Sequence, residues 1–151
     1  MQQEKIEKIA QEKIENVKDR VETMSELARS NKLAMGGHLF IVCLISISYL
    51  LEVIKGTRSI GYVAFIIVLG MVTPIAEIIA YNRNKEAESI KHFISLGYGF
   101  FYTVLLFTTQ NTHTYVFTIP MIIIVTVYND YKYLLYVNIA MIFVNIVQVI
   151  V

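Results

Sequence analysis

The chain has 151 residues, of which 56% are hydrophobic and 17% charged, with a formal net charge of +1. Ordinary soluble domains carry roughly 25% charged residues, so this composition argues against a soluble globular protein. The near balance of 13 Lys and Arg against 12 Asp and Glu gives no reason to expect nucleic-acid binding. The single Cys43 excludes an internal disulfide.

Residues 1–32 are expected to form a cytoplasmic, amphipathic, coiled-coil-like helix. Residues 2–32 contain no Gly or Pro and are rich in Glu, Lys, Gln and Ala, which favour helices. Apolar residues recur there at alternating three- and four-residue steps and form one narrow stripe: Ala10, Ile14, Val17, Val21, Met24 and Ala28. The stripe needs a partner, which is an identical helix, the cytoplasmic ends of the membrane helices or, least favoured, lipid headgroups. A solvated extension that folds weakly alone is the remaining reading.

Residues 33–151 are expected to form an all-α, polytopic membrane bundle, because continuous apolar runs of this length suit a hydrocarbon core of about 30 Å. The paired Gly36 and Gly37, at the start of the first run, mark either a hinge or an unbent stretch of membrane helix. Five spans are predicted, at about 33–54, 60–80, 92–109, 115–128 and 133–151.

The distribution of Lys and Arg predicts a multi-pass protein of the plasma membrane with its N-terminus in the cytoplasm, because cytoplasmic flanks hold the excess of these residues. With that orientation the outer loops hold only Lys55 and Arg58. An odd number of spans then places Val151 outside, unless a further crossing follows.

Two carboxylates within or near the spans are candidate functional groups, because a charge inside a span is costly. Glu52 lies about one turn from the outer end of the first span, three residues before Lys55. It is either an interfacial, paired carboxylate or an anchor for a ligand. Glu77 lies near the inner end of the second span, within reach of headgroups or of Arg83, and is either a structural pair or a proton-linked or gating residue.

Two prolines are candidate hinge or kink positions. Pro74 precedes Glu77 by three residues, and a proline inside a helix removes one backbone hydrogen bond and bends the axis. The Pro74–Glu77 segment is therefore either a moving part or a static kink. Pro120, in the expected fourth span, has the same two readings.

Four polar residues in the third and fifth spans are candidate ligand-binding residues together with Glu52. Tyr98 and Tyr102 lie one turn apart on one helix face beside Gly97 and Gly99. Asn138 and Asn145 also share one face and are expected as their hydrogen-bonding neighbours. Close helix packing and interhelical hydrogen bonds explain the same residues without a ligand.

Enzymatic signatures are missing from the sequence. It shows no Gly-rich phosphate loop, no Cys and His metal spacing and no nucleophile elbow. His38, His92 and His113 are expected to lie singly near the membrane surfaces. We expect no catalysis, no metal and no cofactor.

Several segments from Asn31 onward resemble the multispan membrane region at the N-terminus of signalling receptors in clostridia and their relatives, which include methyl-accepting chemotaxis proteins, diguanylate cyclases and histidine kinases. The residues that carry the resemblance are Tyr49-Leu-Leu-Glu-Val-Ile-Lys-Gly-Thr-Arg58, Gly97-Tyr-Gly-Phe-Phe-Tyr-Thr103, Leu106-Phe-Thr-Thr109, Ile119-Pro-Met121 and Val127-Tyr-Asn-Asp130. The resemblance implies a sensor module, followed in that family by a sixth span and a cytoplasmic output domain.

Three functions follow as hypotheses. The first is the input module of a chemotaxis-type receptor, which reads a stimulus in the bilayer or at its outer surface and passes it to a cytoplasmic output domain. The second is a small oligomeric transporter or channel subunit, which ranks lower because the polar residues are sparse and clustered near the span ends. The third is an assembly subunit that docks a partner through residues 1–32. The expected partners are membrane lipids, a second copy of the chain or a cytoplasmic signalling protein.

Overall fold

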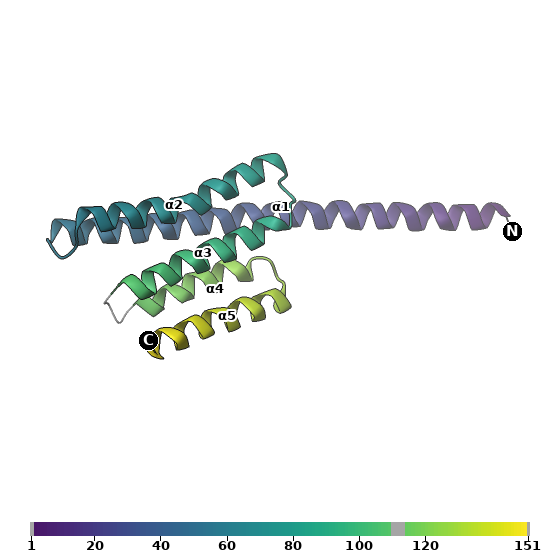
Figure 1. The fold of residues 1–151 in the computed structure, drawn as a ribbon. Coiled ribbons are helices and arrows are strands. Elements are labelled where there is room, and N and C mark those ends of the chain that lie inside the picture. Colours follow the sequence, from purple (N-terminus) through teal and green to yellow (C-terminus); the bar gives the residue numbers. More distant parts are fainter. Residues whose placement is uncertain (1, 110–113, 151) are drawn as a thin grey trace.

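The computed structural model describes residues 2–109 and 114–150, and the elements in this part of the chain are all helices (Figure 1). The predicted all-α class is confirmed. The elements are α1 (Gln2–Ile54), α2 (Ile60–Arg83), α3 (Ser89–Thr108), the 3₁₀ helix η1 (Thr114–Phe117), α4 (Thr118–Thr126) and α5 (Tyr131–Ile150). Four helical stretches are long and apolar enough to cross a membrane, namely Glu26–Ile54 of α1 and the whole of α2, α3 and α5.

The expected fourth span, residues 115–128, is a short helical stretch in the structure. Residues 115–128 contain most of η1, which has 4 residues, and all of α4, which has 9. Together they extend about 20 Å at 1.5 Å per residue, less than a hydrocarbon core of about 30 Å. α4 ends at Thr126, three residues before Asn129, which adopts a left-handed conformation with φ of 50° in the α4–α5 turn. A fifth helix of full spanning length is therefore not confirmed.

The helices alternate in direction, so the connections gather at two ends of the bundle (Figure 1). At the end where α1 enters, here called the proximal end, the Asn31 amide donates to the Lys85 carbonyl at 3.0 Å. At the opposite, distal end, the Tyr49 and Thr109 hydroxyls lie 2.7 Å apart. The α4–α5 turn lies at the proximal end, where Lys91 contacts Asp130 at 3.2 Å.

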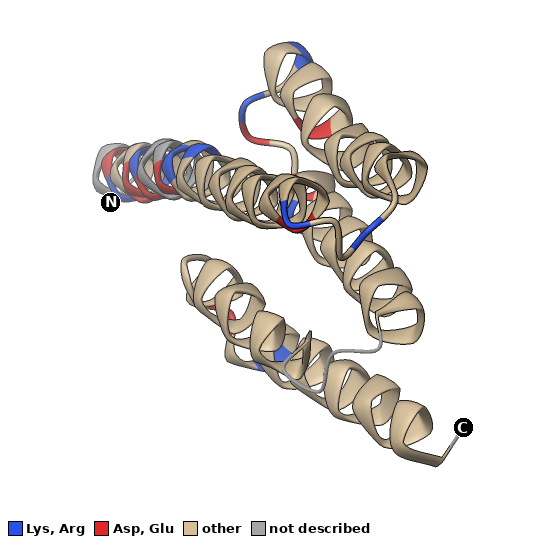
Figure 2. Cartoon of the chain, turned by 90° about the vertical axis from the view of Figure 1, so that its left-hand side faces the viewer, with Lys and Arg blue, Asp and Glu red and all other residues tan. Residues whose placement is uncertain are grey.

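α1 is a single helix of 53 residues, about 80 Å long at 1.5 Å per residue. It continues through Gly36 and Gly37 without a break, so the structure shows no hinge there. Its first part, residues 2–25, is here called the extension, because it projects beyond the other helices (Figure 1). Figure 2 shows that charged residues gather on the extension and near the helix ends, while the rest of the bundle is mostly uncharged.

One heptad register connects the extension to the bundle. Along α1 the buried residues Asn31, His38, Val42, Ile45 and Tyr49 recur at steps of seven, four, three and four. The same register continues backward through Ala28 to Val17, Ile14 and Ala10. The face that α1 buries against α2, α3 and α4 therefore continues as the apolar stripe of the extension, with a drift of about 20° per heptad for a straight helix.

The bundle buries three small apolar clusters and leaves much of its outer surface apolar. Large hydrophobic side chains are exposed on every long helix, including Phe40, Phe65, Leu96 and Phe143. A soluble monomer rarely exposes so much contiguous apolar surface. In a bilayer the same surface contacts lipid chains, so membrane insertion explains this surface.

Candidate functional site

The most distinctive polar contact is a buried pair between His38 of α1 and Glu77 of α2. His38 Nδ1 lies 2.7 Å from Glu77 Oε1, and both side chains are 0% exposed. His38 lies seven residues beyond Asn31, so the pair is about 10 Å from the proximal end at 1.5 Å per residue. A charge buried this far must be paired, because an isolated ion in low dielectric is very costly.

Each partner is held by close packing between helices. Glu77 lies on the buried face of α2 with Gly70 and Pro74. On α3, a Cβ added to Gly97 would lie 2.4 Å from the Thr73 methyl group, so only glycine permits this approach of α2 and α3. The Tyr98 ring meets the His38 ring edge-on at a centroid distance of 5.4 Å. α1, α2 and α3 thus enclose the pair from three sides.

Each partner also keeps one buried polar atom that makes no hydrogen bond to the described residues. These atoms are His38 Nε2 and Glu77 Oε2, and the nearby Thr73 Oγ1 and Tyr128 hydroxyl are in the same state.

The structure pairs Glu77 with His38 and not with Arg83, the partner that the sequence suggested. The expectation that His38 lies singly near the membrane surface was wrong, because His38 is buried in this contact. Both are buried because α1 and α2 turn them toward each other at the same depth. The sequence contained a pattern that indicates this burial. His38 falls in register with the apolar residues of α1, and Glu77 follows Val63, Ile66, Gly70 and Pro74 on the buried face of α2.

The candidate residues of α3 and α5 are brought together only in part. The Tyr102 hydroxyl donates to Asn145 Oδ1 at 2.6 Å, and Asn145 in turn donates to the Met141 carbonyl at 2.8 Å. The Tyr98 hydroxyl donates instead to the Phe117 carbonyl of η1 at 2.7 Å. Asn138 lies two turns nearer the start of α5, half-buried, and outside these bonds. These hydroxyls hold the helices together.

Glu52 lies at the distal end, away from Tyr98 and Tyr102. Its carboxylate accepts from Arg58 Nε at 2.9 Å. The Arg58 guanidinium stands over the rings of Tyr62, at 5.0 Å, and Tyr49, at 5.6 Å. This arrangement is that of a paired interfacial carboxylate, and it closes the α1–α2 turn over the distal end.

The two prolines differ in position. Pro74 lies inside α2, buried three residues before Glu77, and the part of α2 that follows it tilts away from α1 in Figure 1. Pro120 is the third residue of α4, in its first turn, where a helix needs no N–H from proline. α4 directly continues η1, and the reading of Pro120 as a kink or a moving part stays a prediction.

The proximal end holds a second polar group of contacts around the α4–α5 turn. Asp130 accepts from the Tyr133 backbone N–H at 3.0 Å and from Lys91 Nζ at 3.2 Å. The Tyr133 backbone N–H and the Lys91 ammonium lower the pKa of Asp130 below its usual range. The Tyr133 hydroxyl donates to the Lys91 carbonyl at 2.8 Å, and its ring meets that of His92 edge-on. Lys91, Asp130 and Tyr133 thus join α3 to α5.

Three surface grooves accompany these contacts. One of about 470 Å³ lies at the proximal end between α1 and the α4–α5 turn, and is partly polar. Two mostly apolar grooves of about 330 and 350 Å³ open between α3 and α5 and between α1 and α4. None of the three includes Glu52, Tyr98 or Tyr102 among its lining residues. Among the described residues, no group of three His, Cys, Asp or Glu side chains is placed to hold a metal.

The fold and the buried pair define a class: a protein whose described part is all helical, with four helices long and apolar enough to span a membrane and a buried His–Glu contact between two of them. Comparison with known proteins adds nothing to this class, because no family model, curated protein or solved structure matches the chain.

Proposed function

We propose that this chain is the membrane-embedded input module of a signalling receptor, and that α1 transmits the state of the bundle to a cytoplasmic partner. The observation that supports the proposal is the continuity of α1. This one helix carries His38, paired inside the bundle, and the exposed stripe residues Ile14 and Val17 outside it. A change in the contact between Glu77 of α2 and His38 would therefore move the extension as a rigid body.

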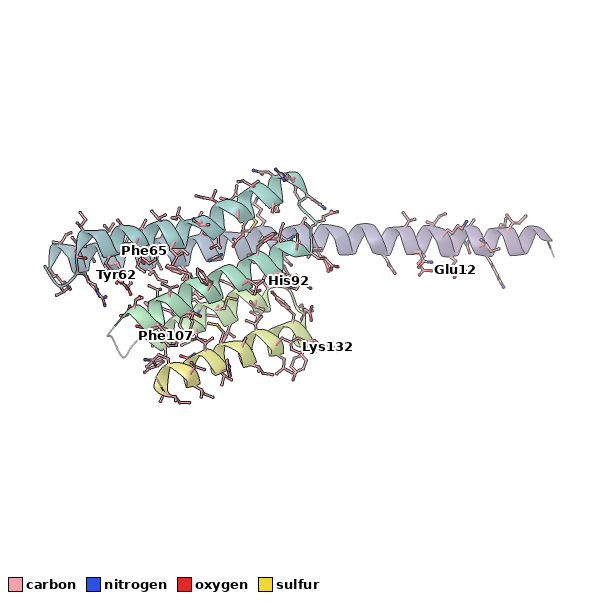
Figure 3. The ribbon with its side chains drawn as sticks, in the orientation of Figure 1. Glu12, Tyr62, Phe65, His92, Phe107 and Lys132 are labelled. Atoms are coloured by element: carbon pink, nitrogen blue, oxygen red, sulfur yellow. The ribbon has the colours of Figure 1, made fainter. Side chains whose placement is uncertain are left out.

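The orientation follows from the charges at the two ends of the bundle. The proximal end and the extension carry most of the Lys and Arg, whereas the distal turn carries Lys55 and Arg58 alone. The excess of Lys and Arg marks the cytoplasmic side, which places the extension in the cytoplasm. Figure 3 labels Glu12 on the extension and Lys132 at the proximal end of α5, both on this side. In this arrangement η1 and α4 form a short fourth pass.

Transport by this chain is less well supported than the input function. Between the His38–Glu77 pair and the distal end lies a buried apolar cluster, whose members include Val42, Ile45, Ile66, Phe101 and Leu105. A substrate path usually needs polar groups or broken helices near the membrane midplane. The apolar cluster provides neither, so the pair is better suited to coupling helices than to passing ions.

An assembly role remains the second candidate, because the exposed stripe would dock a partner even if the bundle were static. The two functions differ in whether the bundle and the extension are coupled. Spin labels at Glu12→Cys and Asn84→Cys, in a Cys43→Ser background, report the distance from the extension to the α2–α3 connection in lipid nanodiscs. Both labelled positions are exposed.

For an input module, Glu77→Gln should shift this distance distribution, because it replaces the carboxyl group that contacts His38. Gly97→Ala should also shift it, because it displaces α2 without contacting α1. Glu52→Gln, which makes the same substitution at the distal end of α1, is the control and should not. If both test variants are folded and keep the parent distribution, α1 is not coupled to the bundle and the input function is wrong.

A further inference from the structure

We infer that the stripe of the extension binds an acidic amphipathic helix of a partner protein, an inference that rests on the proposed function and names its cytoplasmic partner. The described stripe residues are unusually exposed for apolar side chains: Ile14 exposes 68% of its surface and Val17 60%. Ile6, beside the stripe, exposes 65%. No described part of this chain covers them, because the extension projects past all other helices (Figure 1).

The charges beside the stripe select the partner. In the heptad repeat of the extension, Ala10 and Val17 occupy the core position d, and Ile14 occupies the core position a. Lys13 at position g and Lys18 at position e flank this core on its two sides. Flanking residues of this kind choose partners through charge pairs across the helix interface. The acidic residues Glu12, Glu15 and Asp19 lie on the opposite face. A helix with Glu or Asp at its own flanking positions would therefore complement the stripe.

A second copy of this chain does not fit the same face. In a parallel, in-register pair, Lys13 of one copy would face Lys18 of the other, and Glu7, at a core position, would face Glu7. Copies in one membrane share one orientation, so their straight α1 helices cannot pair antiparallel.

Packing also opposes a second copy. The face that continues the stripe is already covered by α2, α3 and α4 within the bundle. Packed helices lie about 8–10 Å apart. A second α1 at that distance along the same face would have to pass through these helices.

A lipid surface is also a poor fit. Val17 lies fourteen residues before Asn31, or about 21 Å from the proximal end at 1.5 Å per residue. Because the extension continues the axis of α1 away from the bundle, the stripe does not face the headgroup layer (Figure 1). A helical partner can follow the stripe along its whole length, whereas a flat membrane surface cannot.

The test uses the full chain in phosphatidylcholine nanodiscs and two designed helical peptides. Both peptides carry Ile and Leu at the core positions, one with Glu and one with Lys at all flanking positions. The acidic peptide should bind at least tenfold more tightly than the basic one by fluorescence anisotropy. Lys13→Glu with Lys18→Glu should reverse this preference, and Val17→Asp should abolish binding of both peptides. The control Lys8→Glu, on the opposite face, should change nothing.

Three outcomes would overturn the inference. Equal binding of the two peptides would show that charge does not select the partner. Disulfide formation between Val17→Cys copies in vesicles, in a Cys43→Ser background, would show that a second copy covers the stripe. A blue shift of a dye at Val17→Cys on adding phosphatidylserine vesicles would show that lipid does. The spin-label test of the input function does not depend on these results, so the two proposals fail separately.

Discussion

His38 of α1 and Glu77 of α2 lie 2.7 Å apart with no exposed side-chain surface on either residue. Membrane helices rarely bury two ionisable groups unless those groups pair. Their contact fixes both the rotation of α1 and its depth against α2.

Removing one partner of this pair should destabilise the bundle more than removing both. His38→Leu or Glu77→Met alone leaves a buried polar group unpaired, at a cost of about 3–5 kcal/mol, whereas replacing a buried pair by apolar residues is often neutral. The double variant should therefore be more stable than either single variant. Steric-trap unfolding in bicelles measures the free energy of unfolding of the parent, the two single variants and the double variant. Additive losses would contradict a direct pairing.

Gly97→Ala should weaken the contact between α2 and α3. The new Cβ would lie 2.4 Å from the Thr73 methyl group, so the helices must separate. Overpacking of this kind costs about 1–3 kcal/mol. Gly99→Ala is the matched control, because its Cβ would meet nothing within 4 Å. It should be neutral or stabilising by up to about 1 kcal/mol, the difference in helix propensity. Equal unfolding free energies for the two variants would rule out close packing at Gly97.

The hydrogen bond from Tyr102 to Asn145 should appear as coupling between α3 and α5. In a double-mutant cycle of Tyr102→Phe and Asn145→Leu, we expect a coupling free energy of about 0.6–1.7 kcal/mol. This is the range measured for hydrogen bonds between membrane helices. Asn138→Leu paired with Tyr102→Phe is the control and should be additive, because Asn138 lies outside the bond. Coupling of the same size in both cycles would mean that the effect is general loosening of α5.

Asp130 should remain charged to unusually low pH. Its folded pKa is lowered by the Tyr133 N–H and by Lys91, so the stability that it contributes is present at neutral pH. This contribution is lost only as the pH falls through the folded pKa, below about 3.9. Carbon NMR of the Asp130 carboxyl in nanodiscs should give a midpoint below that value. Lys91→Met should raise the midpoint, and a midpoint at or above about 3.9 in the parent would be inconsistent with the contact.

The orientation can be measured in intact cells with a membrane-impermeant thiol reagent. In a Cys43→Ser background, Thr57→Cys at the distal turn should react, and Asn84→Cys at the proximal end should not. Both positions are exposed, so access to the reagent depends on the side of the membrane. Labelling of Asn84→Cys alone would reverse the orientation and place the extension outside.

The sequence alone determined the helical class, four of the membrane-length helices and the helical nature of the N-terminal residues. These properties depend on local composition and on the 3.6-residue period, which a single helix carries by itself. The fourth apolar run, predicted at residues 115–128, is also helical, as η1 and α4, but it is too short to be confirmed as a fifth membrane span.

Only the tertiary structure decided which polar residues meet. Glu77 was singled out from the sequence, but its partner lies 39 positions away on another helix, so no local pattern connects it to His38. The pairing depends on how far each helix is rotated and inserted, which close contacts such as that of Gly97 with Thr73 set. Glu52 and Tyr98, which the sequence grouped as one site, lie apart for the same reason: depth and rotation are properties of the assembled bundle, because they are set by packing between helices.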